Sequence, residues 1–155
     1  MNINPNDWSC LPTSFANVLR MDLGEFMQRI GHDGSDIVPE WGERRGFHTQ
    51  ECIEVCETMG VRCVMIDLFP LAAPDPDSPP VAVYMGDPKI RLYRHIGDSE
   101  GVLLGIVKKD TRLVGHAAAW YDDTIIDPRG GGLCWDASNF LYKFFDPRQY
   151  IKVYR

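Results

Sequence analysis

The sequence has 155 residues, and at roughly 100–200 residues per domain this length predicts one domain over residues 1–155. The chain is 45% hydrophobic and 25% charged, which is typical of globular proteins. Its net charge of −6 lacks the basic excess of proteins that bind phosphate groups. We therefore expect neither nucleic acid nor a membrane as a partner, and the oligomeric state stays open.

The N-terminal residues MNINPNDWSCLP contain neither the basic start nor the apolar core of a secretory signal. The longest apolar stretch, residues 102–107, is too short to cross a bilayer. We therefore expect an intracellular, cytoplasmic protein. Without secretory context, an odd set of cysteines predicts free thiols rather than disulfides: Cys10, Cys52, Cys56, Cys63 and Cys134.

The first predicted helix spans residues 10–20. Apolar residues from Phe15 onward recur at helical spacing, and Pro12 suits a first turn, where its missing N–H costs nothing. Cys10 is therefore expected at a helix N-terminus.

Two further helices are predicted over residues 23–30 and 49–59, each followed by a glycine that can end it. The intervening segment 31–48 is rich in glycine and charge, which predicts a structured surface loop or a cleft wall. Residues 61–69 are predicted to form a buried strand. Five prolines in residues 70–80 predict an extended loop.

The rest of the chain has the composition of β-strands separated by short turns. The predicted strands are residues 81–85, 89–93, 102–107, 114–121, 124–127 and 149–154. Helices first and an antiparallel sheet second define an α+β fold.

Three residues far apart in the sequence are candidates for catalysis. Cys10 lies at the positive end of a helix dipole, which lowers the pKa of a thiol and favours the nucleophilic thiolate. His116 follows Gly115 on a predicted strand, so there is space beside its ring. If Asp122 and Asp123 form a two-residue hairpin loop, Asp127 falls on the same face as His116 and diagonal to it, within hydrogen-bonding reach.

This order of a cysteine at a helix start, a histidine on a strand and an Asp-Pro after the next strand resembles the papain-like cysteine peptidase superfamily. The closest likeness within it is to compact peptidases that process double-glycine leader peptides of bacteriocins. The segments WSCLPTSFANVL, IGHDGS and RRGFHTQE are also similar to small proteins of bacteriophages.

The resemblance implies a papain-like fold in which N-terminal helices pack on a C-terminal antiparallel sheet. It makes Cys10 the nucleophile, His116 the general base and acid, and Asp127 the residue that orients the imidazole. The family places a glutamine six residues before the nucleophile as oxyanion donor. Asn4 stands there, with Asn6 as a competing candidate.

The activity implied is hydrolysis of a peptide or isopeptide bond through a thioester, with no metal or cofactor. The substrate would be a protein or peptide, of host or viral origin if the chain is phage-encoded. Leu11-Pro12 replaces the glycine that leader-processing peptidases favour after the cysteine, so their specificity is not carried over. Two alternatives stay open: an inactive papain-like binding module, and an acyltransferase or amidase of the same superfamily.

A different site is conceivable on the third helix. His48, Cys52 and Cys56 are spaced four apart, and Cys63 follows on the next strand, so the four side chains could bind zinc. The spacing lacks the tight knuckles of structural zinc sites, and packing in the core is the favoured interpretation. His32 is expected to be a solvated loop histidine, with a place in the substrate cleft as the alternative.

Overall fold

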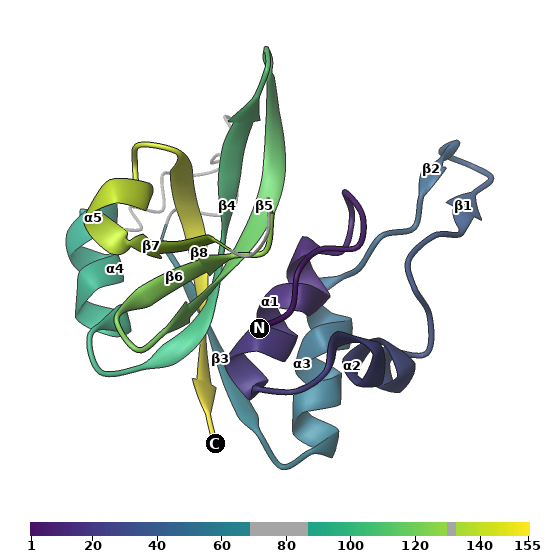
Figure 1. Cartoon of the computed structure of the whole chain (residues 1–155), viewed down its shortest axis with the longest axis horizontal. Helices are drawn as coiled ribbons and strands as arrows, with labels where there is room; N and C mark the ends of the chain where they lie inside the picture. The colour runs from purple at the N-terminus through teal and green to yellow at the C-terminus, as the bar shows by residue number, and fades with distance from the viewer. Residues whose placement is uncertain (69–86, 130–132) are drawn as a thin grey trace, which may run out of the picture.

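The computed structural model describes residues 1–68, 87–129 and 133–155 (Figure 1). Six strands form an antiparallel sheet in the order β3-β8-β4-β5-β6-β7, with α1 to α3 on one side and α4 and α5 on the other. The predicted α+β class, with N-terminal helices packed on an antiparallel sheet, is confirmed. None of the helices in the described ranges is long and apolar enough to cross a membrane.

The described elements are, in chain order, α1 (Cys10–Leu19), α2 (Leu23–Ile30), β1 (Ile37–Val38), β2 (Glu43–Arg44), α3 (Thr49–Thr58), β3 (Arg62–Asp67), α4 (Pro88–Ile96), β4 (Glu100–Lys109), β5 (Arg112–Tyr121), β6 (Thr124–Asp127), β7 (Leu133–Asp136), α5 (Ala137–Phe140) and β8 (Phe145–Tyr154). The three N-terminal helices agree with the predicted ranges to within a residue. The capping of α2 explains its sharp ends: Asp22 accepts from the N–H of Glu25, and Gly31 ends the helix in the left-handed conformation.

The hairpin of β5 and β6 has the predicted register. Asp122 and Asp123 both have positive φ, of 51° and 55°, as a two-residue hairpin turn requires. Tyr121 therefore lies opposite Thr124, and the pairing continues to Ala119 opposite Ile126.

Two hydrophobic clusters cover the two faces of the sheet, and β5 contributes to both of them. Ala117 and Ala119 pack into the cluster around α1 to α3, whereas Ala118 and Trp120 pack into the cluster around α4 and α5. Successive side chains of β5 thus point to opposite faces of the sheet, and both faces are buried. The small alanine side chains let both helical layers approach β5 closely.

Two predictions about the strands are wrong. Residues 89–93 belong to α4, because Asp87 accepts a hydrogen bond from the N–H of Lys89 and Pro88 occupies the first turn. The strand predicted to be buried is the edge strand β3, which pairs with β8 on one side and leaves Val64 40% exposed. The predicted loop 70–80 and strand 81–85 lie outside the described residues.

Candidate active site

Cys10 is the first residue of α1, and the chain leading to it is fixed by Asn6. The Asn6 Oδ1 accepts from the backbone N–H of Trp8 (3.1 Å) and from the hydroxyl of Ser9 (2.6 Å). Ser9 is fully buried, and its carbonyl accepts from the hydroxyl of Thr13. Cys10 itself is partly buried at the margin of the α1 cluster. The thiol is thus held at a helix N-terminus, as predicted.

His116 and Asp127 form a buried hydrogen-bonded pair. The imidazole Nε2 lies 2.9 Å from the Asp127 Oδ1, and the two residues are only 7% and 4% exposed. The predicted diagonal arrangement across β5 and β6 is therefore confirmed as geometry. Phe145 meets the imidazole edge-on, with 6.2 Å between ring centroids, and helps to fix its plane.

His116 makes the largest contribution that lowers the pKa of the Cys10 thiol, and Cys10 in turn contributes to raising the pKa of His116, so the two side chains are neighbours. Because Asp127 occupies Nε2, Nδ1 is the ring nitrogen left for the sulfur. Burial raises the pKa of the Cys10 thiol. The hydrogen bond and positive charge of His116, with the backbone N–H groups of Ala117 and Leu11, outweigh burial and hold that pKa below its ordinary value.

The same contacts shift the pKa values of the other two groups. Burial lowers the pKa of His116, but the hydrogen bonds to Asp127 and Cys10 outweigh it and raise the pKa above its usual value. Burial raises the pKa of Asp127, and hydrogen bonds from His116 and Arg129 reverse this and bring it to about 2. The arrangement therefore favours a thiolate, an imidazolium and a carboxylate in a row.

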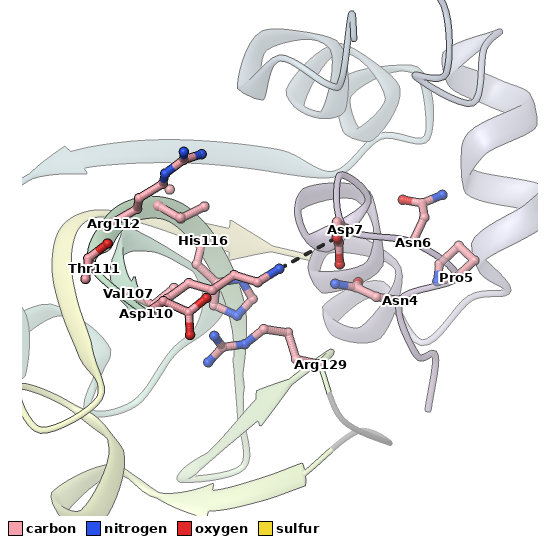
Figure 2. A pocket seen from close by; sticks show the side chains of 13 residues that line it. Asn4, Pro5, Asn6, Asp7, Val107, Asp110, Thr111, Arg112, His116 and Arg129 are labelled. Atoms are coloured by element: carbon pink, nitrogen blue, oxygen red, sulfur yellow. Dashed lines mark ion pairs between the residues drawn. The ribbon is translucent and has the colours of Figure 1, made fainter. Parts of the chain in front are cut away.

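A cleft of about 800 Å³ opens in front of His116 (Figure 2). One wall is the N-terminal segment with Asn4 and Asp7, and the other is the end of the β4–β5 hairpin. Lys109 of the hairpin reaches Asp7 across the cleft, with 3.7 Å between Nζ and Oδ2. Both side chains are largely exposed, so this ion pair contributes little to stability.

Asn4 and Asn6, the two candidates for an oxyanion donor, have different environments. Asn4 lines the cleft together with His116, and its backbone N–H donates to the carbonyl of Pro128 at 3.0 Å. Its buried Oδ1 has no hydrogen-bond partner among the described residues. Figure 2 shows the Asn4 amide directed toward the cleft and the Asn6 amide directed away from His116. Asn6 is engaged in the turn before α1.

Beside the cleft, one edge of β5 has no partner strand in the part of the chain that the structure describes. No described strand residue pairs with β5 before Ala119 on the side opposite β4. Backbone groups alternate in direction along a strand, so those of Ala117, Gly115 and Leu113 point the same way as those of Ala119, toward this edge. The backbone of Ala117 helps to lower the pKa of Cys10, Gly115 is exposed and lines the cleft, and Leu113 is an exposed residue farther along the same edge.

The zinc alternative is not supported. Cys52 and Cys56 are fully buried in the hydrophobic cluster under α1, and burial contributes to raising the pKa of each thiol. The neighbouring Cys63 makes the largest contribution that raises the pKa of Cys56, and Cys56 lowers the pKa of Cys63. Among residues 1–68, 87–129 and 133–155, no group of three or more histidine, cysteine or acidic side chains is placed to hold a metal. His48 is the N-cap of α3.

The expectation of a solvated His32 is wrong. Its side chain is 11% exposed, its Nε2 lies 3.1 Å from Glu51 and its Nδ1 accepts from the N–H of Gly34. The ring also stacks on Phe47, with 5.1 Å between centroids. His32 therefore attaches the 31–48 segment to α3.

One residue that contacts the site was not among the predicted ones. Arg129 donates from its backbone N–H and its guanidinium to the carboxylate of Asp127. The signal was available, because an aspartate commonly accepts from the N–H two residues later in a turn.

Comparison with known proteins identifies the fold. No protein-family model and no curated protein matches the sequence. A solved structure that resembles this chain is the peptidase domain of Streptococcus ComA, a bi-functional ABC transporter involved in a quorum-sensing pathway. The TM-score is 0.54 at 10% identity, over 98% of this chain and 95% of that one. The chain therefore has the α+β fold of a peptidase domain. The likeness to phage proteins stays a prediction.

Proposed function

We propose that this protein is a papain-like cysteine peptidase that cleaves a peptide or isopeptide bond through Cys10, His116 and Asp127. The observation that carries the proposal is the buried, hydrogen-bonded pair of His116 and Asp127, whose imidazole lowers the pKa of the neighbouring Cys10 thiol and lines an open cleft. A thiol paired with a base that a third group orients is the arrangement of thiol hydrolases. The fold likeness to the ComA peptidase domain supports the same activity.

In the proposed mechanism the Cys10 thiolate adds to the substrate carbonyl carbon and forms a C–S bond and an oxyanion. As the oxyanion collapses, the C–N bond breaks and the His116 imidazolium gives its proton to the leaving amine, so a thioester remains on Cys10. A water molecule then attacks the thioester carbonyl through its oxygen, while His116 takes a proton from that water. The C–S bond breaks, the acid product leaves and the Cys10 thiolate is regenerated.

The open edge of β5 supports a peptide as the substrate. An extended peptide can add to a strand edge and take up its free backbone N–H and C=O groups. Gly115 lines the cleft and offers such groups two residues before Ala117, which adjoins Cys10, and the exposed Leu113 continues the same strand edge. A small non-peptide amide would leave this edge unused. The finer hypothesis is a host or viral protein as the substrate of a phage-encoded enzyme.

Alkylation tests whether the Cys10 thiol is activated. We expect iodoacetamide to label Cys10 stoichiometrically well below pH 8, because its lowered pKa keeps the thiolate at pH values where an ordinary thiol is protonated. The labelled residue is identified by mass spectrometry of peptides. Cys134 is exposed and serves as an internal reference thiol in the same chain. A Cys10 rate equal to that of Cys134 across the pH range would contradict the proposal and favour the inactive binding module.

We further propose that the Asn4 side-chain amide stabilises the oxyanion together with the backbone N–H of Cys10. Asn4→Ala should then lower kcat by about 10²–10³-fold with little change in KM, the effect of losing one oxyanion donor. The bond from the Asn4 backbone to Pro128 survives the substitution. Peptide hydrolysis gives kcat and KM, and the alkylation rate of Cys10 should stay at the wild-type value. An unchanged kcat would remove Asn4 from the mechanism.

A further inference from the structure

We propose that Arg129 is a positioning residue of this site, which clamps the Asp127 carboxylate and thereby sets the orientation and basicity of His116. The inference rests on the proposed function and deepens it. Arg129 contacts no reacting atom and acts through Asp127.

The clamp uses both oxygens of the carboxylate. Arg129 Nη2 lies 2.8 Å from Oδ2, and Nε lies 3.1 Å from Oδ2 and 3.2 Å from Oδ1. The backbone N–H of Arg129 donates to Oδ1 at 3.0 Å, the same oxygen that faces His116 Nε2 at 2.9 Å. Rotation of the carboxylate would break several of these bonds together, so the oxygen facing His116 is fixed.

The two partners of this ion pair differ in burial, unlike the partners of an ion pair in a protein core. The Asp127 side chain is 5% exposed, whereas Arg129 is 43% exposed and lines the cleft in front of His116. Figure 2 shows Arg129 beside His116 on the cleft side. The guanidinium therefore adjoins the buried carboxylate on one side and the solvent of the cleft on the other.

Arg129 also changes the charge that His116 senses. A carboxylate stabilises a neighbouring imidazolium, and a cation on that carboxylate offsets part of the effect. The other charged groups around His116 are Cys10 from α1 and the Lys109–Asp7 pair across the cleft, with Asp110 and Arg112 at the hairpin end. Among the described residues, Arg129 is the only arginine or lysine that is hydrogen-bonded to Asp127. Removing its charge should therefore raise the pKa of His116 while loosening the carboxylate.

The test compares Arg129→Gln and Arg129→Lys with Arg112→Gln, a control that removes a cation from the same cleft without touching Asp127. NMR of the histidine ring protons gives the pKa of His116, assigned among the four histidines with His116→Gln. Peptide hydrolysis gives kcat/KM. For Arg129→Gln we expect a higher His116 pKa and kcat/KM lower by about 10–100-fold, the usual effect of losing a partner that orients a functional histidine. Arg129→Lys keeps the charge but not the two-point contact, so the His116 pKa should stay near wild type while kcat/KM falls.

A His116 pKa in Arg129→Gln equal to that of wild type or Arg112→Gln would overturn the proposal. The NMR measurement needs no turnover. If the wild-type chain hydrolyses no peptide, the proposed function fails while the clamp is still tested. If the NMR spectrum shows that Arg129→Gln is unfolded, the His116 pKa and the kcat/KM of Arg129→Lys test the proposal instead. An unchanged kcat/KM in Arg129→Lys would then overturn it.

Discussion

Replacing Cys10 with alanine is expected to abolish peptide hydrolysis, with kcat/KM falling by about 10⁴-fold or more. The proposed mechanism has a single nucleophile, and without its sulfur no thioester can form. Cys10 is partly buried at the margin of a hydrophobic cluster, so the smaller alanine should leave the fold intact. The measurement is peptide cleavage followed by chromatography, with circular dichroism to verify the fold.

Cys134→Ala is the matched control, because Cys134 is exposed and lies far along the chain on β7. It should retain wild-type activity. Cys10→Ser adds a nearly isosteric variant that keeps a weak nucleophile, and it should be almost as inactive as Cys10→Ala. Retention of wild-type cleavage in both Cys10 variants would contradict a thiol mechanism.

Replacing His116 with alanine should be nearly as damaging and should also change the pH dependence of the thiol. His116 provides the largest of the contributions that lower the pKa of Cys10, so its loss should move alkylation of Cys10 to higher pH. Hydrolysis should fall by about 10⁴-fold, because no group is left to protonate the leaving amine. His95→Ala, on α4, is the control and should match the wild type.

The wild-type pH profile follows from the same two groups. The thiolate exists above the lowered pKa of Cys10, and the imidazolium exists below the raised pKa of His116. Activity should therefore rise and then fall with pH, giving a bell whose alkaline limb lies above the ordinary histidine value of about 6.5. Alkylation of His116→Ala with the wild-type pH dependence would show that the imidazole does not activate the sulfur.

Much of the site could be predicted because it depends on local rules. The helix start at Cys10 follows from spacing and from Pro12. The meeting of His116 with Asp127 follows from the length of one hairpin loop, since a two-residue turn fixes every later pair. Neither step needed knowledge of distant parts of the chain.

The errors arose where local patterns were ambiguous or where distant contacts decide. Residues 89–93 alternate polar and apolar side chains like a strand, but Leu92 and Ile96 are four apart and are both buried by the helix they share. The place of Asn4 depends on a backbone bond to Pro128, more than a hundred residues away. His32 could not be placed because its partner Glu51 lies on another element.

Cys10 and His116 belong to different layers of the molecule. The sulfur borders the cluster around α1 to α3, whereas His116 lies on the β5 face of Ala118 and Trp120 and touches Phe145 of the other cluster. The two side chains meet where the N-terminus of α1 packs against β5. A chain in which α1 is not packed on the sheet would keep an ordinary thiol, so under the proposed function peptidase activity requires the assembled fold and is lost when the two layers separate.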